Sequence, residues 1–579
     1  MLNTIRKFFA FSGEENRKKF VSSIYLAVIQ AIFEALKIPA IAVMIRALLQ
    51  ENIQTKDILM SFGIMLASIT GAGLIKSKSV MLQTEAGYDT CAKKRVEIAE
   101  HMRYLPMGYF NEKSLGQITS VTTNVMESLE NVATRVIMLV CEGILTTSLI
   151  IIMLMFFDIR IALILLAGVG LFFLVNGRLQ AAAGKLAPVK VDAEEKLVEK
   201  VLEYLPGMTE VKAYHLTGQK SRELNDAIYE NSKINTDMEF TLIPRMSLQS
   251  LIAKLTGVAM MIASCAFYCN GSMDALTAVV MVISAFIIYA SLETAGNYSA
   301  LIRVVDASVD RAQEILSVPQ MNLEGGDIVP KTRDISADRV EFSYEKRRII
   351  QGISLNIPEK TTTAIVGPSG GGKTTLVNLL ARFWDTDKGD ICLGGYNVKD
   401  YDYDSLMSNF SFVFQNVYLF HDTVANNIRF GRPDAPMDEV INAAKKACCH
   451  DFIMKLPNGY DTEIGEGGAS LSGGEKQRIS IARAMMKDAP VIFLDEATAN
   501  VDPENENELI HAISELTKEK TVIMIAHRLK TVKDADMILV VDHGNIVQQG
   551  KHDELMQQDG IYRKFVGERR EAVSWKMHK

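Results

Sequence analysis

Cysteine and clustered basic residues are both scarce in this sequence, and each absence argues against a class of protein. The 579 residues include seven cysteines, an odd number at scattered positions, so a framework of disulfide bonds is not expected. The formal net charge is -7 and no basic block is present, which argues against binding to DNA or RNA. The N-terminus has no signal-peptide cleavage pattern, and we interpret it as a lead-in to the first apolar run.

Two groups of cysteines have spacings that also occur in metal sites or disulfides. Cys265 and Cys269 are four residues apart near the end of an apolar run, and Cys448 and Cys449 precede His450. Cys265 and Cys269 could form a disulfide or bind a metal, and the second group could be a ligand set, but we interpret both groups as residues that pack on helix faces.

Long apolar runs fill the first half of the chain. Crossing a hydrocarbon core of about 30 Å takes about 20 apolar residues in a helix. The runs of this kind predict an α-helical six-span transmembrane domain over residues 1–315, with spans near 21–49, 58–82, 136–157, 161–176, 248–269 and 276–295. The fourth run is short, and we expect its helix to continue into the polar stretch that follows.

Lysine and arginine are distributed unevenly around these spans. They are concentrated in the N-terminal lead-in and in the stretches that follow spans two and four, whereas the turn at 270–274 has none. The positive-inside rule therefore predicts a multi-pass protein of the cytoplasmic membrane, with both termini and both long stretches in the cytoplasm.

The two long cytoplasmic stretches have apolar residues at helical spacing and few helix breakers. Each has one turn-like interruption, at Tyr104–Phe110 and at Tyr204–Gly207. We expect a helix that descends from the bilayer, a short cross-piece that can dock onto another domain, and a helix that returns. The helical spacing disfavours the alternative of two disordered loops.

Charged residues inside spans cost about 2.5–3.5 kcal/mol each on insertion scales, so each one needs a reason. Glu34 and Lys37 are three residues apart and can neutralise each other. Glu142, Lys254 and Glu293 have no such local partner. We expect them to face a water-filled cavity or one another, as a substrate cavity or as salt bridges between helices. Asn297 lies four residues after Glu293, on the same helix face.

Beyond a linker at 316–334, rich in proline and glycine, the chain reads as an α/β domain over 335–579. Thr363–Thr375 matches a strand, a glycine-rich loop and a helix start, the pattern of a P-loop NTPase. Backbone N–H groups of such a loop surround phosphate oxygens, the lysine reaches the outer phosphates and the hydroxyl after it binds Mg²⁺. The predicted ATP-binding residues here are Gly367, Pro368, Ser369, Gly370, Gly371, Gly372, Lys373, Thr374 and Thr375.

A second motif, made of two acidic residues, follows the apolar run Val491–Leu494. This run predicts a buried parallel strand. Asp495 comes at its carboxyl end, where open α/β sheets bind their ligands, and can hold Mg²⁺. Glu496 is then placed to polarise the attacking water.

A second glycine-rich helix start lies between these elements, in Leu471–Arg478. Its Ser472, Gly473 and Gly474 suit an anion, yet the first loop already holds the phosphates. We therefore expect two copies of the domain to pair head to tail, each offering this loop to the nucleotide of the other.

With these motifs in place, the C-terminal part resembles an ABC ATPase domain, and the whole chain resembles an ABC exporter-type (type IV) half-transporter. The resemblance implies that Leu471–Glu475 is the family's signature motif, with Glu475 in place of the commoner glutamine. It implies further roles for Tyr344, which would stack on adenine, for Gln415, which would sense Mg²⁺, and for His527, which would contact the γ-phosphate. It also identifies Glu463–Gly468 as the segment that touches the cross-pieces and Ala499–Asp502 as the loop that joins the nucleotide sites, with Asn500 and Val501 in place of commoner residues.

The implied activity is ATP hydrolysis coupled to transport. Mg²⁺ would be held by Thr374, Gln415 and Asp495, Glu496 would act as general base, and Lys373 and His527 would stabilise charge on the γ-phosphate. The working unit would be a dimer, either a homodimer or a heterodimer with a second half-transporter.

The direction of transport and the cargo are less constrained. The architecture favours export of a hydrophobic or amphipathic compound, a lipid or a peptide. The alternative is import of iron–siderophore complexes as a heterodimer, because the compact chain and the Leu105–Phe110 cross-piece resemble that subgroup. Six fused spans argue against a soluble ABC ATPase, and Glu496 argues against a channel or structural partner without turnover.

Overall fold

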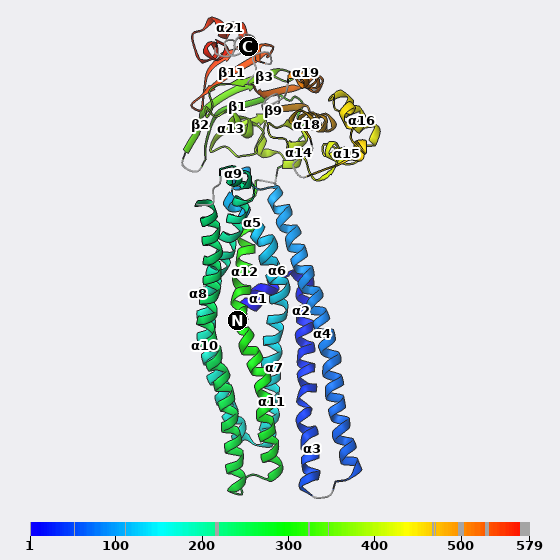
Figure 1. Cartoon of the computed structure of the whole chain (residues 1–579), viewed down its shortest axis with the longest axis vertical. Helices are drawn as coiled ribbons and strands as arrows, with labels where there is room; N and C mark the ends of the chain where they lie inside the picture. The colour runs from blue at the N-terminus through cyan, green and yellow to red at the C-terminus, as the bar shows by residue number, and fades with distance from the viewer. Residues whose placement is uncertain are drawn as a thin grey trace. The chain divides into compact units, whose positions relative to one another are not determined.

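The structure is a computed structural model that describes residues 2–50, 53–110, 112–214, 219–321, 325–344, 347–465, 468, 471–495, 503–526 and 532–567. The chain divides into two compact units (Figure 1). A helical unit comprises Met1–Arg103 and Phe110–Pro319, and an α/β unit comprises Tyr104–Tyr109 and Gln320–Lys579.

The helical unit is built from long helices joined by short turns. Within it α2 packs along α4, and α8 packs along α10. Its helices are α1 (Leu2–Phe11), α2 (Gly13–Ala35), α3 (Lys37–Leu49), α4 (Thr55–Arg103), α5 (Glu112–Ser120), α6 (Met126–Ser128), α7 (Thr134–Phe157), α8 (Ile159–Tyr204), α9 (Met208–Ala213), α10 (Gln219–Cys269), α11 (Ala275–Ser299) and α12 (Leu301–Leu316).

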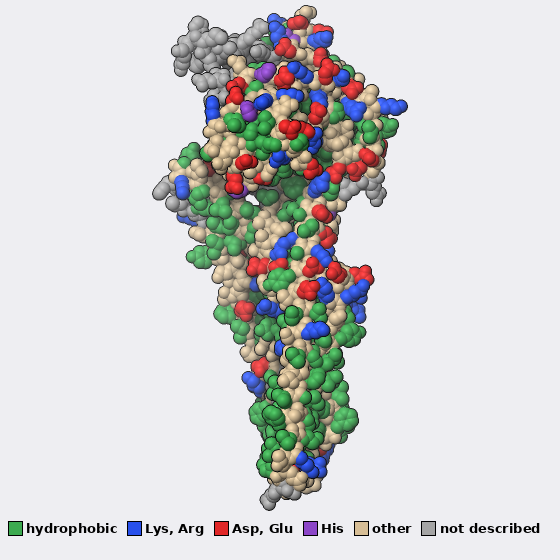
Figure 2. All heavy atoms as spheres, turned by 90° about the vertical axis from the view of Figure 1, so that its right-hand side faces the viewer, with side chains coloured by type: hydrophobic (Ala, Val, Ile, Leu, Met, Phe, Trp, Pro, Cys, Tyr) green, Lys and Arg blue, Asp and Glu red, His purple; other side chains and the backbone are tan. Residues whose placement is uncertain are grey.

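Five helical segments among the described residues are long and apolar enough to cross a membrane: Gly13–Leu49, Thr55–Arg103, Ser114–Phe157, Ile159–Tyr204 and Arg222–Cys269. The sixth predicted span lies in α11, which has 25 residues and includes the apolar stretch Ala275–Phe286. Figure 2 shows apolar side chains gathered in a broad band on one face of the helical unit, as expected of a surface that contacts lipid. The expected continuation of the fourth span is confirmed, since α8 is 46 residues long.

Local sequence signals explain where several of these helices begin. The carboxylate of Asp158 accepts a hydrogen bond from the backbone N–H of Arg160 at 2.8 Å and caps α8. Asp274 caps α11 in the same way through the N–H of Thr277 at 3.0 Å. The first span is interrupted at Leu36, because Pro39 has no N–H to continue the hydrogen-bond ladder through that turn.

Both cross-pieces exist, although the second lies further along the chain than the sequence indicates. The first contains a short 3₁₀ turn, Met107–Tyr109, and Tyr104–Tyr109 belongs to the α/β unit. In the second, residues 205–207 form a turn and the short helix α9 comes after it, at Met208–Ala213. The prolyl-glycyl pair at Pro206 and Gly207 thus ends one helix rather than forming the cross-piece itself.

The α/β unit contains two main sheets. A six-stranded sheet has the order β12-β11-β3-β10-β9-β6, in which β12 is the antiparallel edge, and a four-stranded antiparallel sheet has the order β2-β1-β4-β5. The strands are β1 (Ile335–Tyr344), β2 (Arg347–Ile357), β3 (Thr362–Val366), β4 (Lys388–Leu393), β5 (Tyr396–Asn397), β6 (Phe410–Val413), β7 (Asp422–Thr423), β8 (Glu463–Ile464), β9 (Val491–Asp495), β10 (Thr521–Ile525), β11 (Met537–Asp542) and β12 (Asn545–Gly550).

The helices of this unit cover both faces of the six-stranded sheet. They are α13 (Lys373–Leu380), α14 (Tyr403–Ser408), α15 (Val424–Arg429), α16 (Met437–Lys446), α17 (His450–Ile453), α18 (Gly473–Lys487), α19 (Pro503–Thr517) and α21 (His552–Gln557).

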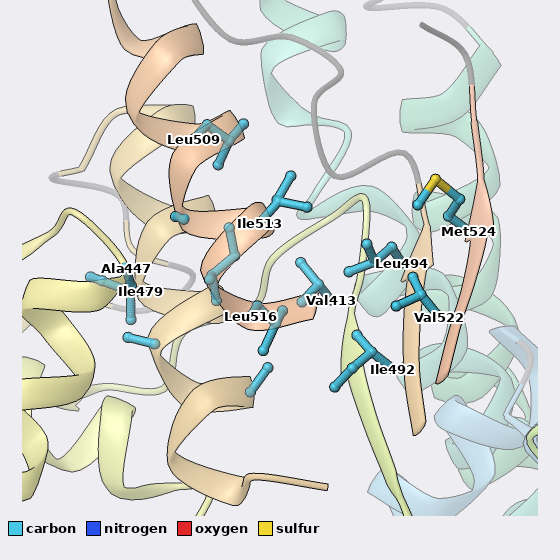
Figure 3. Close-up of a cluster of buried hydrophobic side chains, with 14 of the residues drawn as sticks. Val413, Ala447, Ile479, Ile492, Leu494, Leu509, Ile513, Leu516, Val522 and Met524 are labelled. Carbon is cyan, nitrogen blue, oxygen red and sulfur yellow. The ribbon is translucent and has the colours of Figure 1, made fainter. Parts of the chain in front are cut away.

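Alternation along the strands creates two separate cores. Ile492 and Leu494 of β9 face one core, to which α18 and α19 contribute, whereas Phe493 faces the other, to which α13 contributes. Figure 3 shows the first core, where Ile513 and Leu516 of α19 lie beside the strands. The sheet therefore separates the helix after the phosphate loop from the helix after the signature motif.

The cysteines differ in their surroundings. All seven are free, and no cluster of metal-ligand side chains occurs within the part of the chain that the structure describes. Cys449 is buried in the first core, and burial raises the pKa of its thiol to about 12. Cys265 and Cys269 are exposed on α10.

Candidate functional site

The phosphate loop lies where β3 ends and α13 begins. Gly367 and Gly372 have φ angles of +147° and +103°, which L side chains rarely adopt. A Cβ built on Gly367 would also overlap the carbonyl oxygen of Val541 on β11, so glycine is required there. The predicted strand, loop and helix are all present, and the helix N-terminus points its free N–H groups toward the loop.

The side chains at the start of α13 divide into buried and exposed. Lys373 is 7% exposed, and its ammonium donates to the carbonyl oxygens of Gly367 at 3.1 Å and Pro368 at 2.9 Å. The charge is therefore held inside the loop that would receive phosphate. Thr374 is exposed, whereas Thr375 is buried.

Asp495 lies at the same edge of the sheet as the phosphate loop. Ile525 of β10 pairs with Ile365 of β3 on one side and with Asp495 on the other. Asp495 is thus level with Ile365 two strands away, about 10 Å across the sheet. Gly367 follows two residues later, so the carboxylate and the loop share the carboxyl edge of the sheet.

Gln415 reaches this edge from the neighbouring strand. Val413 of β6 pairs with Leu494 of β9, which places Gln415 one residue beyond the level of Asp495. The amide of Gln477 on α18 donates to the carbonyl oxygen of Phe414 at 3.3 Å and so anchors the backbone just before Gln415. A carboxylate, an amide and a threonine hydroxyl are oxygen ligands that suit Mg²⁺.

Tyr344 ends β1 beside the helix that follows the phosphate loop. Its hydroxyl and that of Thr375 are 3.3 Å apart. The ring lies edge-on to Phe342 and Trp384, with centroids 4.9 and 4.8 Å away. The four-stranded sheet therefore brings the predicted adenine-stacking ring to the nucleotide loop.

The signature motif forms a capping box at the start of α18. Ser472 Oγ accepts from the N–H of Glu475 at 3.3 Å, and the Glu475 carboxylate accepts from the N–H of Ser472 at 2.8 Å. The carboxylate also accepts from the Ser472 hydroxyl at 2.8 Å. Ser472 and Gly473 are exposed. The helices that follow the signature loop and the phosphate loop, α18 and α13, cover opposite faces of the sheet.

The charged residues of the spans fall into two separate cavities. Lys254 Nζ of α10 and a carboxylate oxygen of Glu293 on α11 are 3.9 Å apart, and Ser250 donates to Glu293 at 2.6 Å. Asn297 lines the same cavity of about 600 Å³, as its helical spacing predicts.

Glu142 lies elsewhere in the helical unit. Its carboxylate on α7 accepts from Gln30 of α2 at 2.5 Å and lies 3.4 Å from Lys76 Nζ of α4. These residues line a second cavity of about 230 Å³. The structure thus pairs Lys254 with Glu293, and Glu34 with Lys37 as expected, but does not bring Glu142 to them.

Comparison with known proteins agrees with this arrangement along most of the chain. Residues 20–292 match the family model described as the ABC transporter transmembrane region, and residues 350–499 match that of the ABC transporter. YgaD of Bacillus subtilis, an ATP-binding/permease protein named for multidrug export, is 31% identical over 81% of this chain and 82% of its own length. This chain belongs to the ABC transporter family.

Two further comparisons agree with this membership. The ATP-dependent lipid A-core flippase of Legionella pneumophila is 33% identical over 86% of this chain and 85% of its own length. A solved structure of a bacterial Atm1-family ABC exporter with ATP bound is 25% identical, with a TM-score of 0.85 over 96% of this chain and 98% of the other. The ABC transporter chain is therefore a multi-pass membrane half-transporter that binds ATP and couples its hydrolysis to transport.

Several predicted residues of this ABC transporter lie outside the described residues. They are Glu496, His527 and the loop Ala499–Asp502. Within Glu463–Gly468, residues 466 and 467 are also outside, whereas Glu463 and Ile464 form β8 and pair with β7.

The sequence did not indicate that Trp384 lies beside the predicted nucleotide site of this ABC transporter. The indole packs against Tyr344 and lies next to Gly108 of the first cross-piece. A tryptophan shortly after a predicted helix is an ordinary core residue by pattern, so only the three-dimensional packing identifies it.

Proposed function

We propose that this half-transporter exports a lipid or a similar amphipathic compound as a homodimer. The observation that carries the proposal is a cavity of about 600 Å³ on α10 and α11 with both apolar and polar walls. The apolar side chains of Ile243, Met246 and Leu251 line it together with the polar side chains of Ser250, Lys254 and Glu293. An amphipathic molecule has the two matching parts, and relatives named lipid A-core flippases support a lipid as cargo.

Lys254 and Glu293 would contact the polar part of the cargo in this proposal. Lys254 is 64% exposed at its side chain, so its charge is available to a ligand at little desolvation cost. We assign Glu142 to pairing between helices, because Gln30 and Lys76 already contact its carboxylate.

For the nucleotide site we propose the roles that its geometry supports. Mg²⁺ would be held by Thr374, Gln415 and Asp495, and when bound it supplies positive charge beside the phosphates. Tyr344 would stack on adenine, and the P-loop residues Gly367–Thr375 would surround the phosphates.

The remaining roles fall on the charged groups around the γ-phosphate. Lys373 would neutralise charge there together with His527, and Glu496 would orient water for attack. Lys373 fits this role because its ammonium lies inside the loop, where it donates to the carbonyl oxygens of Gly367 and Pro368.

The placement of the two loops on opposite faces of the sheet supports a dimer. Ser472, Gly473 and Gly474 begin the helix on the opposite face of the sheet from α13, and we propose that a second chain supplies them to each phosphate loop. This chain carries every hydrolysis motif, which makes a second, different chain unnecessary.

The proposed domain limits are 1–315 for the transmembrane domain, 316–334 for the linker and 335–579 for the ATP-binding domain. Both termini would lie in the cytoplasm, since lysine and arginine flank the spans on that side.

Transport in proteoliposomes tests the direction. The protein is reconstituted with its ATP-binding domains outside and a short-chain fluorescent phospholipid in both leaflets, and ATP is added. Export predicts ATP-driven movement from the outer leaflet, which is cytoplasmic in this orientation, to the inner leaflet. No ATP-driven lipid movement, together with ATP-driven movement of an iron–siderophore complex out of the vesicles, would instead support the importer.

A further inference from the structure

The indole of Trp384 lies between the proposed adenine-stacking residue and the first cross-piece. On one side its ring centroid is 4.8 Å from that of Tyr344 and 5.5 Å from that of Phe342, with interplanar angles of 78° and 71°. Phe342 and Tyr344 are in turn 4.9 Å apart at 88°. The three rings form one edge-to-face cluster, an arrangement that aromatic side chains favour.

The cross-piece is seated on the other side of the same indole. A Cβ built on Gly108 would be 2.6 Å from Cη2 of Trp384 and would overlap its Cζ3, so only glycine fits against the ring. The N–H of Met107 donates to the carbonyl oxygen of Phe383 at 3.2 Å, next to the tryptophan. The hydroxyl of Tyr104 donates a hydrogen bond to the carboxylate of Asp404 at 3.3 Å, which holds the start of the cross-piece in place.

The ring of Tyr344 is held at its far end as well. Its hydroxyl lies 3.3 Å from that of Thr375, two residues after Lys373. The ring is therefore connected to the phosphate-loop helix at one end and to Trp384 along its edge. Side chains packed this closely cannot shift independently, because interiors leave little free volume.

We propose that Trp384 is a positioning residue that holds the ring of Tyr344 and transmits occupancy of the adenine site to the cross-piece Tyr104–Tyr109. This route is separate from Gln415 and rests on the proposed function, in which adenine stacks on Tyr344. Coupling between sites is reciprocal in equilibrium binding. A change at Gly108 therefore alters ATP affinity, although this residue would not touch ATP.

Tryptophan fluorescence tests the first half of this proposal. The chain has two tryptophans, Trp384 and Trp575, so Trp575→Phe leaves one indole to observe in the full-length dimer in lipid nanodiscs. We expect the emission of Trp384 to change on addition of ATP with Mg²⁺, with the same half-saturation as binding of radiolabelled ATP. Tyr344→Leu should remove the emission change at ATP concentrations that still saturate binding. A constant emission while ATP binds, or an unaltered change in Tyr344→Leu, would overturn the proposal.

A double-mutant cycle between Gly108→Ala and Trp384→Leu tests the second half. We expect each single change to raise the half-saturating ATP concentration at least threefold. In the double variant the smaller leucine makes room for the new methyl group, so the two factors should not multiply. Gly63→Ala on α4, where nothing lies within 4 Å of the added Cβ, is the matched control and should bind ATP as the parent does.

Two outcomes of the cycle would contradict the role of Trp384. One is a Gly108→Ala variant that binds ATP like Gly63→Ala, and the other is a pair of factors that multiply. Trp384→Phe guards against simple loss of folding, since it keeps an aromatic ring. It should restore most of the affinity that Trp384→Leu loses, and failure to do so would also count against the proposal.

The result for Lys373→Ala separates this inference from the proposed function. If Lys373→Ala retains ATP hydrolysis, the proposed nucleotide site is wrong and the route from it fails as well. If Lys373→Ala abolishes hydrolysis while Trp384 gives no signal, the nucleotide site stands and only the route through Trp384 is refuted.

Discussion

Replacing Ser472 with alanine separates a structural role of the signature motif from a role in ATP turnover. The serine caps α18, and loss of such a cap costs about 1 kcal/mol. Thr423 caps α15 in the same way, accepting from the N–H of Asn426 at 3.1 Å, but it lies outside the proposed nucleotide site. Thr423→Ala is therefore a matched control for the capping cost.

The two variants should be alike in stability and different in activity. A loss of about 1 kcal/mol lowers the melting temperature of a domain of this size by about 2–4 °C in both cases. A hydrogen bond to a charged group contributes about 1.5–3 kcal/mol, so losing a contact from Ser472 to phosphate should slow ATP hydrolysis about 10- to 150-fold. Thr423→Ala should change it less than about twofold.

The assay is steady-state ATP hydrolysis of the full-length protein in nanodiscs, with thermal unfolding measured on the same samples. Equal losses of hydrolysis in Ser472→Ala and Thr423→Ala would refute the reasoning, because the signature serine would then act only as a helix cap.

Two other predictions concern the thiols and the membrane cavity. With its pKa raised to about 12, Cys449 has a thiolate fraction of roughly 1 in 30,000 at pH 7.5 and should resist maleimide in the folded protein. Cys269, which is exposed at the end of its span beside the turn at 270–274, should react, and equal labelling rates would show that Cys449 is accessible. Glu293→Gln removes the charge 3.9 Å from Lys254 Nζ and should raise at least fivefold the concentration of fluorescent phospholipid that half-maximally stimulates ATP hydrolysis. Glu142→Gln, in the separate cavity, should leave that concentration within twofold, and a similar effect of both changes would argue against two distinct cavities.

Local signals were enough to predict the elements and the nucleotide loop. The glycine-rich loop at Gly367–Gly372 depends on residues within a few positions of one another, so its pattern is visible in the sequence itself. The contact between Lys254 and Glu293 could also be expected from the sequence, because a charged side chain in a span is unfavourable in lipid.

Features that depend on which helices are neighbours could not be predicted from the sequence. Separating Glu142 from Lys254 requires knowing that α7 faces α2 and α4 rather than α10. The position of Gly108 against Trp384 requires the docking of the cross-piece, since these residues are far apart in the chain. The turn-like interruption at Tyr204–Gly207 is present, but the short helix of the second cross-piece, α9, begins only after it, at Met208.

A mixed dimer tests the central claim, that each nucleotide site is shared by two chains. A chain with Lys373→Ala and a differently tagged chain with Ser472→Ala are co-expressed and purified through both tags. In this dimer one site combines the intact phosphate loop of one chain with the intact signature motif of the other. We predict that the mixed dimer hydrolyses ATP at a substantial fraction of the native rate, while each parental homodimer does not. Hydrolysis no faster than that of the parents would contradict the account.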